Sequence, residues 1–144
     1  MSGRVFQILQ QMLKMRKDRS VAKSKMVKAE FDRVRSFNEQ IDSYATEYES
    51  QWMNAAQKGD TVLQLQTQAS FGQKLRATAA SQQPEILNLQ AQSQEALEKA
   101  RQDAERLKTF ENFMANRQRL KQKALDQQDE KALEDVLQAR HRSS

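Results

Sequence analysis

The sequence predicts an all-α protein, folded as a long antiparallel two-helix coiled-coil hairpin. Helix formers (Ala, Leu, Gln, Glu, Lys and Arg) dominate the 144 residues, which include one proline and three glycines. Apolar side chains recur at steps of three and four residues, and Gly59 alone separates two long stretches of this kind. The composition, 38% hydrophobic and 30% charged, also suits a disordered chain, but the regular apolar spacing argues against disorder.

The first helix is expected from about residue 4 to residue 57, because the stretch from Val5 to Gln57 contains neither glycine nor proline. Two series of side chains show the helical spacing. The first consists of Val27, Phe31, Val34 and Phe37, and the second of Ile41, Tyr44, Tyr48 and Ala55.

The turn is expected at residues 58–60. Gly59 suits the position after a helix C-terminus, because glycine adopts a left-handed conformation at no steric cost. Thr61 and Gln64 match a capping box, which opens the next helix. A connection this short sends the second helix back along the first.

The second helix is expected from about residue 61 to residue 140, so that residues 1–144 form a single coiled-coil unit. Pro84 lies inside this helix, where it removes a backbone hydrogen bond and clashes with the preceding turn. We expect a kink there, or a short break with Ser81 capping a restarted helix. Because the second arm is longer, Arg117 to Arg140 should overhang as a charged helix that frays without a partner.

Residues equally distant from the turn along the two arms should face each other. This register places Phe6 opposite Phe113 and Tyr48 opposite Phe71, and it brings Arg16 to Asp103. The other pairs that it predicts are Lys14–Glu105, Leu9–Phe110, Met12–Leu107, Met15–Ala104, Ala22–Leu97, Ile41–Thr78 and Tyr44–Leu75.

No combination of residues supports catalysis, and we expect no enzyme, cofactor, metal or small-molecule substrate. His141 is the only histidine, cysteine is absent, and no phosphate-binding GxxxxGK(S/T) loop occurs. A carboxylate cluster is interpreted as a solvated helix face; it consists of Asp126, Asp129, Glu130, Glu134 and Asp135.

Features that the sequence lacks also indicate where in the cell the protein is located. A chain without cysteine fits a reducing compartment. The sequence has no run of about 18 apolar residues that could span a membrane, and its N-terminus does not match a signal peptide. We therefore expect a cytoplasmic protein.

Charge is distributed unevenly along the chain. Residues 1–36 carry ten bases against three acids, whereas residues 37–57 carry four acids and no base. A basic arm can bind nucleic acid or an anionic membrane, but exposed aromatic residues are not interleaved with these bases. A solvated and partly paired helix face is the ordinary interpretation, and an acidic protein surface is the next.

Aromatic side chains gather beside the turn. Tyr44, Tyr48 and Trp52 follow one another at four-residue steps, and Phe71 and Leu75 face them in the predicted register. Packing in the seam accounts for some of them. Because a two-helix seam cannot cover large aromatics on all sides, the others should be exposed and mark a partner site.

Several segments resemble the flagellar type III export protein family FliJ and, more loosely, its injectisome counterparts of the YscO type. They are the opening ILQQMLKMRKDR, the tyrosine pair in YATEYESQW, the glycine-bearing turn, FGQKL and RLKTFENFMANRQ. The resemblance covers nearly the whole chain.

The resemblance implies an antiparallel coiled coil similar to the stalk subunit of rotary ATPases. Its paired termini would enter the hole of a hexameric export ATPase ring, promote ring assembly and couple the ring to the export gate. It would also escort free substrate chaperones for reuse. The protein would then be cytoplasmic and peripherally associated with the inner-membrane export apparatus, and nucleic acid would not be among its partners.

Carried over position by position, the resemblance assigns contacts with the cytoplasmic part of the gate to a patch beside the turn. This gate patch comprises Ile41, Tyr44, Tyr48, Phe71 and Leu75. Phe37, Thr78 and Gln82 occupy further positions where other members carry different residues, including a histidine in place of Gln82, and Pro84 is another departure. Contacts with the ring are assigned to basic residues: Lys14, Arg16, Lys17, Arg117, Arg119 and Lys121.

Three alternatives stay open. The chain could be the equivalent stalk of a virulence type III secretion system, an unrelated coiled-coil tether, or a nucleic-acid-binding hairpin. A tether should form a symmetric dimer, whereas a ring stalk should be a monomer until it meets its ATPase. A nucleic-acid binder should show a strong dependence on salt.

Overall fold

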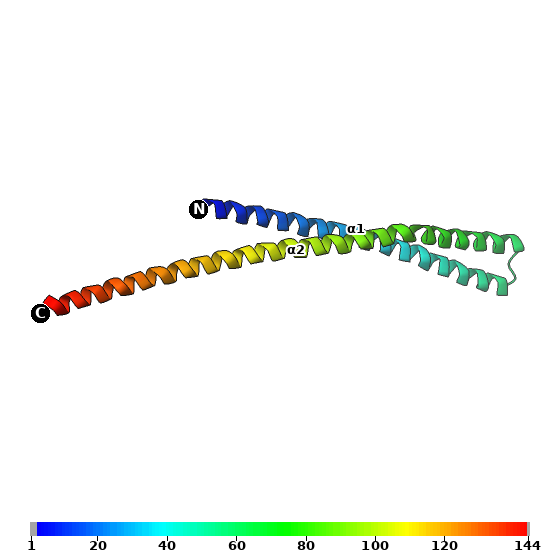
Figure 1. The fold of residues 1–144 in the computed structure, drawn as a ribbon. Coiled ribbons are helices and arrows are strands. Elements are labelled where there is room, and N and C mark those ends of the chain that lie inside the picture. Colours follow the sequence, from blue (N-terminus) through cyan, green and yellow to red (C-terminus); the bar gives the residue numbers. More distant parts are fainter. Residues whose placement is uncertain (1–2, 144) are drawn as a thin grey trace. The chain divides into compact units, whose positions relative to one another are not determined.

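The computed structural model describes residues 3–143 as two α-helices. α1 runs from Gly3 to Gln57 and α2 from Val62 to Ser143, and no residue in the described range lies in a β-strand. Figure 1 shows the short connection between them. The predicted all-α, two-helix hairpin is confirmed. Met1, Ser2 and Ser144, which the predicted unit included, lie outside the described residues.

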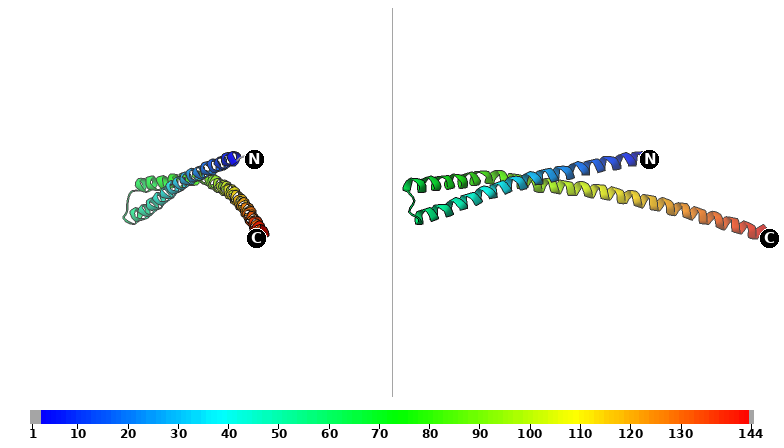
Figure 2. Two further views of the ribbon diagram at one scale, coloured as in Figure 1. Left: turned by 90° about the vertical axis from the view of Figure 1, so that its left-hand side faces the viewer. Right: turned by 180° about the vertical axis from the view of Figure 1, so that it is seen from behind.

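The described chain forms two compact units, each with its own pair of antiparallel helical stretches. Unit 1 consists of residues 3–17 and 102–143, and unit 2 consists of residues 18–101. Within each unit, the α1 and α2 stretches lie side by side and run in opposite directions (Figures 1 and 2).

Backbone hydrogen bonds close α1 at the predicted glycine. Gly59 has φ of 81°, the left-handed conformation. Its N–H donates to the Ala56 carbonyl at 3.3 Å, and the Asp60 N–H donates to the Ala55 carbonyl at 3.1 Å. This pair of bonds is a Schellman motif, in which glycine allows the last carbonyls of a helix to find donors.

The predicted capping box opens α2. The Gln64 N–H donates to Thr61 Oγ1 at 3.3 Å, and the Thr61 N–H donates to Gln64 Oε1 at 3.4 Å. Two backbone donors that the first helical turn leaves without partners are thereby satisfied. The turn chemistry read from the sequence is confirmed on both sides of Gly59.

Burial repeats every seven residues along both helices. In α1, every seventh residue from 6 to 55 and every seventh from 17 to 45 is buried or half-buried. In α2 the same holds for every seventh residue from 65 to 114 and from 68 to 110. Two buried positions per seven residues define the seam of a coiled coil, and we call these the seam positions.

Alanines supply most of the fully buried apolar side chains of the seam. The buried apolar residues of the seam are Ile41, Ala45, Ala55, Ala79, Ile86, Ala96, Ala100 and Leu107. Alanine lets two helices approach closely, because the distance between their axes depends on the side chains at the contact. Larger seam residues, such as Phe6, Leu13 and Tyr48, are only half-buried.

The predicted register is correct at two aromatic pairs. The ring centroids of Phe6 and Phe113 are 6.2 Å apart, and those of Tyr48 and Phe71 are 4.7 Å apart. Met12, Met15 and Leu97 are exposed and lie outside the seam positions, so their predicted pairings across the helices stay predictions. Steps of three and four residues fit a seam and its flank equally well, and only the seven-residue repeat separates them.

Asp103 has a partner other than the predicted Arg16. It occupies a seam position and is only 3% exposed. Its Oδ1 lies 3.9 Å from Nη1 of Arg106 on the same helix. Both groups belong to α2, so this ion pair does not join the helices.

Pro84 does not interrupt α2, which is a single helix through this position. The alternative of a short break with Ser81 as a cap is therefore wrong. The Ser81 hydroxyl donates to the Thr78 carbonyl at 2.8 Å, so it is bonded back to the preceding turn. A kink at Pro84 stays a prediction.

The C-terminal part of α2 has no helix packed against it within unit 1. All residues from Ala115 to Ser143 are exposed, whereas Met114 is half-buried. In Figures 1 and 2, the orange and red part of α2 extends beyond the N-terminal end of α1. At 1.5 Å per residue this overhang is roughly 43 Å long.

Candidate functional site

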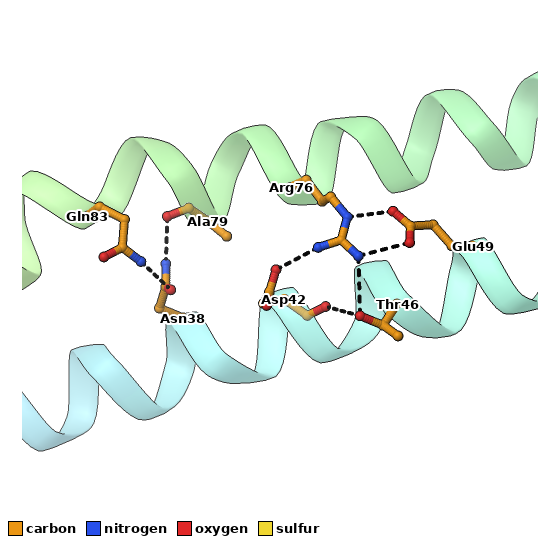
Figure 3. A network of polar contacts seen from close by, with 7 residues as sticks. All are labelled: Asn38, Asp42, Thr46, Glu49, Arg76, Ala79 and Gln83. Atoms are coloured by element: carbon orange, nitrogen blue, oxygen red, sulfur yellow. Dashed lines mark hydrogen bonds and ion pairs between the residues drawn. The ribbon is translucent and has the colours of Figure 1, made fainter.

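The contacts of Arg76 show which residues of unit 2 share a side of the coiled coil. Arg76 directly follows the half-buried Leu75, and its guanidinium contacts Asp42, Thr46 and Glu49 (Figure 3). Each of these three directly follows a seam position of α1. Residues that follow seam positions thus meet on one side, which we call the following side. Residues that precede seam positions lie on the opposite, preceding side.

A charged cluster occupies the following side of unit 2. Nη1 of Arg76 donates to Asp42 Oδ1 at 3.0 Å, and Nη2 donates to Glu49 Oε2 at 2.9 Å and to Thr46 Oγ1 at 3.3 Å. Nε of Arg76 donates to the other oxygen of Glu49, so this pair is bidentate. These hydrogen bonds lower the pKa of Glu49 and raise the pKa of Arg76.

Four residues predicted for the gate patch lie on the preceding side of unit 2. Phe37, Tyr44 and Phe71 are large and exposed, with 55% exposure for Tyr44 and 46% for Phe71. Thr78 is exposed beside them along α2. Each directly precedes a buried seam residue; the pairs are Phe37–Asn38, Tyr44–Ala45, Phe71–Gly72 and Thr78–Ala79. The fold thus collects these aromatics on one side, away from the charged cluster.

The other predicted gate residues belong to the seam. Ile41 is buried, and Tyr48, Leu75 and Gln82 are half-buried. The Tyr48 ring packs on Phe71 with an angle of 58° between the ring planes. These residues therefore support the exposed side chains of the preceding side and contribute little exposed surface themselves.

A polar layer crosses the seam next to the gate patch. Asn38 is 5% exposed, and its Nδ2 donates to the Ala79 carbonyl at 2.9 Å and to Gln82 Oε1 at 3.1 Å. Nε2 of Gln83 donates to Asn38 Oδ1 at 3.2 Å (Figure 3). All polar atoms of the buried amide therefore take part in hydrogen bonds that depend on this register.

Sequence reasoning missed both polar features of unit 2. The signal for the charged cluster is the opposition of Arg76 to two acids seven residues apart, Asp42 and Glu49. The signal for the polar layer is an asparagine at a seam position, which becomes visible only after the seven-residue repeat is recognised.

The basic residues assigned to the ATPase ring all lie in unit 1. Lys14, Arg16, Arg119 and Lys121 are exposed, whereas Lys17 is half-buried at a seam position. The structure therefore places most of this positive charge where a partner can reach it.

Arg117 has a defined place in unit 1. Its Cζ lies 4.4 Å from the centroid of the Phe6 ring, a cation–π contact between α2 and α1. Phe6 also packs against Phe110 and Phe113, with centroids 6.4 Å and 6.2 Å away. Three aromatic rings and one guanidinium thus close the last paired layer before the overhang.

Neither a metal-binding group nor a membrane-spanning helix is found among the described residues. No three His, Cys, Asp or Glu side chains among residues 3–143 are placed to hold a metal ion. Within that same range, neither helix contains an apolar stretch suited to cross a bilayer.

Comparison with known proteins identifies the family to which the chain belongs. The sequence profile of the family described as Flagellar FliJ protein matches residues 3–144, nearly the whole chain. No curated protein and no solved structure matches it. The match extends over both units, the turn and the overhang. The chain belongs to the flagellar FliJ protein family and is thus a component of type III protein export.

Proposed function

We propose that this chain is the central stalk of the flagellar export ATPase and links the ATPase ring to the export gate. Membership of the FliJ family supports an export role. The observation that carries the more specific proposal is the separation of the assigned residues: the exposed aromatics of the gate patch lie on one side of unit 2, and the bases assigned to the ring lie in unit 1.

Unit 1 is the end proposed to enter the ring. Residues 3–17 carry four bases and no acid, and the first part of the overhang adds Arg117, Arg119, Lys121 and Lys123. Exposed charge pairs are individually weak and do not require one fixed geometry. Such contacts suit a stalk that must hold the ring without locking its subunits into one arrangement.

Unit 2 is the end proposed to dock on the cytoplasmic part of the export gate. Tyr44 and Phe71 supply exposed aromatic area, and Tyr48 supports the Phe71 ring from the seam. Aromatic side chains dominate the energetics of many protein interfaces, because they bury large areas at a low cost in conformational entropy. The same exposed aromatics are proposed to bind free substrate chaperones.

The mechanism proposed involves no bond-making by the chain. The family is a non-catalytic component of export, and we propose that this member acts on ATP turnover only through contacts with the ATPase. We place it in the cytoplasm, peripherally associated with the inner-membrane export apparatus. The flagellar description of the family favours this system over a virulence-type system.

The two surfaces can be tested separately. Phe71→Ala and Tyr48→Ala should weaken binding to the gate's cytoplasmic domain by about tenfold or more, as expected for aromatic hot spots. Stimulation of the ATPase should stay nearly intact, since both residues lie in unit 2. Binding is measured by titration calorimetry and stimulation by ATP turnover.

Leu87→Ala is the matched control, because Leu87 is an exposed apolar residue of the same unit outside the gate patch. It should leave gate binding unchanged. Loss of both activities in Phe71→Ala would indicate collapse of unit 2, and unchanged gate binding in both aromatic variants would contradict the assignment.

A further inference from the structure

The seam of unit 1 contains a buried carboxyl group. Asp103 is 3% exposed at a seam position of α2. Its Oδ1 lies 3.9 Å from Nη1 of Arg106 on the same helix, and its Oδ2 is buried with no hydrogen-bond partner among the described residues. Burial of an unsatisfied polar atom lowers stability, because the atom gives up its hydrogen bonds with water. The Asp103 carboxyl therefore opposes the pairing that buries it.

The opposite seam position in α1 also carries a charged residue. The seam positions of unit 1 are 6, 13 and 17 in α1 and 103, 107, 110 and 114 in α2. The helices are antiparallel, and Phe6 packs on Phe110 and Phe113 at one end. Lys17 and Asp103 consequently share the layer at the other end, and we call them the charged layer. Removing two charged groups from water is costly even when they attract each other.

The remaining layers of unit 1 bury little apolar surface. None of residues 3–17 is fully buried, and Phe6 and Leu13 are half-buried. Gln10, seven residues before Lys17, is exposed. On α2, Leu107 is the one fully buried apolar residue among residues 102–143. Segments with few buried apolar contacts are the ones that open locally in folded proteins.

Aromatic contacts hold the far end of this pairing closed. The Phe6 ring lies 6.4 Å from Phe110 and 6.2 Å from Phe113, measured between ring centroids. Aromatic pairs at this separation are favourable beyond the area that they bury. Unit 1 thus has a stabilising contact at one end and a destabilising layer at the other.

The polar layer of unit 2 is built differently. Asn38 donates to the Ala79 carbonyl and to Gln82 Oε1, so its amide is bonded across the seam. These bonds are lost when the helices separate. The ion pair of Asp103 with Arg106 joins two residues of α2, and separation of α1 leaves it in place. The first layer favours pairing, and the second does not.

We propose that unit 1 opens locally, with residues 3–17 separating from α2 while α2 stays helical, and that the charged layer sets how often this happens. Separation returns the Asp103 carboxyl to water, which offsets part of the lost apolar contact. It also uncovers Leu107 and Phe110 on α2. The charged layer is therefore a conformational device built into the seam.

This inference goes beyond the stalk proposal and does not depend on it. Opening is a property of the chain alone, and its measurement requires neither an ATPase nor an export gate. Failure of the opening proposal leaves the ATPase measurements as they are, and failure of the stalk proposal leaves the opening.

Hydrogen–deuterium exchange of the full chain, followed by NMR, measures the opening. The amides of residues 8–17 are compared with those of residues 38–48 in unit 2, after correction for their intrinsic exchange rates. Residues 8–17 should exchange at least about tenfold faster, and they should share one degree of protection, as expected for a segment that opens as a unit.

A double variant removes the charged layer. Lys17→Leu with Asp103→Leu copies the next layer of the seam, which contains Leu13 and Leu107. Replacement of buried charges by apolar residues of suitable size commonly stabilises a protein. Exchange of residues 8–17 should therefore slow about tenfold, whereas exchange of residues 38–48 should stay unchanged.

Two further variants complete the test. Lys14→Leu with Glu111→Leu is the matched control, because it removes one exposed base and one exposed acid from the same two stretches. It should change exchange of residues 8–17 by less than about twofold. Phe6→Ala should speed this exchange about tenfold, because it removes the aromatic contacts that close the far end.

Several outcomes overturn the proposal. Unchanged exchange in the double variant would do so, as would equal slowing in the matched control. Protection that declines steadily from residue 17 to residue 8, and that the double variant leaves unaltered, would identify fraying of the helix end instead. Equal slowing of residues 38–48 in the double variant would show that unit 1 opens only when the whole chain unfolds.

Discussion

Gly59 lies in the turn and Gly72 at a seam position of α2, and substitution by alanine should have opposite effects on stability at the two positions. Gly59 has a positive φ of 81°, which an L-residue adopts only with strain. Gly72 lies inside α2, and a Cβ added there would meet Tyr48 Cβ at 3.6 Å, an ordinary contact distance. One glycine is required by its backbone, and the other only weakens its helix.

We therefore expect Gly59→Ala to lower the free energy of unfolding by about 1–2 kcal/mol, the cost of a left-handed residue with a Cβ. Gly72→Ala should raise it by about 0.5–1 kcal/mol, because alanine loses less backbone entropy in a helix. Urea unfolding of the two variants gives both values. A loss of stability in Gly72→Ala would show that the helices pack more tightly there than the structure indicates.

The hydrogen bonds of Arg76 should make the free energy of unfolding depend on pH in the acidic range. Its hydrogen bonds lower the pKa of Glu49 in the folded state, so the unfolded carboxyl has the higher pKa. The resulting stabilisation is present above the unfolded pKa and is lost as pH falls through the folded pKa. The stability difference between wild type and Arg76→Gln should accordingly shrink from about pH 6 to about pH 3.

Thermal unfolding across this pH range measures that difference. Lys74→Gln is the control, because it removes the same charge from α2 two residues away. A wild-type advantage that stays constant down to the lowest pH would mean that Arg76 stabilises by packing rather than through its carboxylate partners.

At the scale of the helical elements, Asn38 sets the alignment of α1 against α2. The hydrogen bonds between its side-chain amide and Ala79, Gln82 and Gln83 can form only in the observed register. An apolar residue would pack in any heptad register, so polar seam residues give specificity at a cost in stability. Apolar seam residues of unit 2 recur every seven positions, so Asn38 distinguishes the observed register from one shifted by a heptad.

Asn38→Leu should raise the free energy of unfolding on the order of 1 kcal/mol while allowing shifted registers. Two cysteine pairs can report the register in a chain that has no cysteine of its own. Tyr48→Cys with Gly72→Cys reports the native one, because the Cβ separation of 3.6 Å fits a disulfide. Tyr48→Cys with Ala79→Cys reports a shift by one heptad.

Oxidation of the two cysteine pairs, with and without Asn38→Leu, then measures the populations of the native and shifted registers. The shifted pair should crosslink only in the Asn38→Leu background. Identical crosslinking in both backgrounds would show that another feature, such as the turn at Gly59, fixes the register alone.

The sequence predicts the helices and the turn well because their signals are local. Gly59, Thr61 and Gln64 act within a few residues, and the structure confirms each of them. The seam was harder to predict, because large apolar residues such as Met12 suggested it, whereas alanines supply five of its eight fully buried apolar residues. Exposure of Met12 and burial of Ala45 depend on the distance between the helices, which no local pattern specifies.

The candidate site was predictable to a similar degree. Tyr44 and Phe71 were assigned to the gate patch from the sequence, and the structure exposes both on one side. Whether the patch binds the gate stays a prediction. The bonds of Arg76 lay beyond sequence reasoning, because they join residues up to 34 positions apart on two helices.

Across the whole molecule, the aromatic gate patch and the bases assigned to the ring belong to different units. Residues 37–57 carry four acids and no base, whereas residues 3–17 carry four bases and no acid. A chain that joins two assemblies needs two surfaces that do not compete for one partner. We propose that the opposite local charge of these two segments favours a different partner for each surface.

The proposed stalk function requires unit 1 to act on a hexameric flagellar export ATPase. It is tested by titrating the purified chain into that ATPase and measuring ATP turnover together with ring size by light scattering. We predict that turnover and ring formation rise and saturate at one chain per ring, and that Arg117→Glu with Lys121→Glu abolishes both. Turnover and ring size that stay unchanged across the wild-type titration would contradict the account.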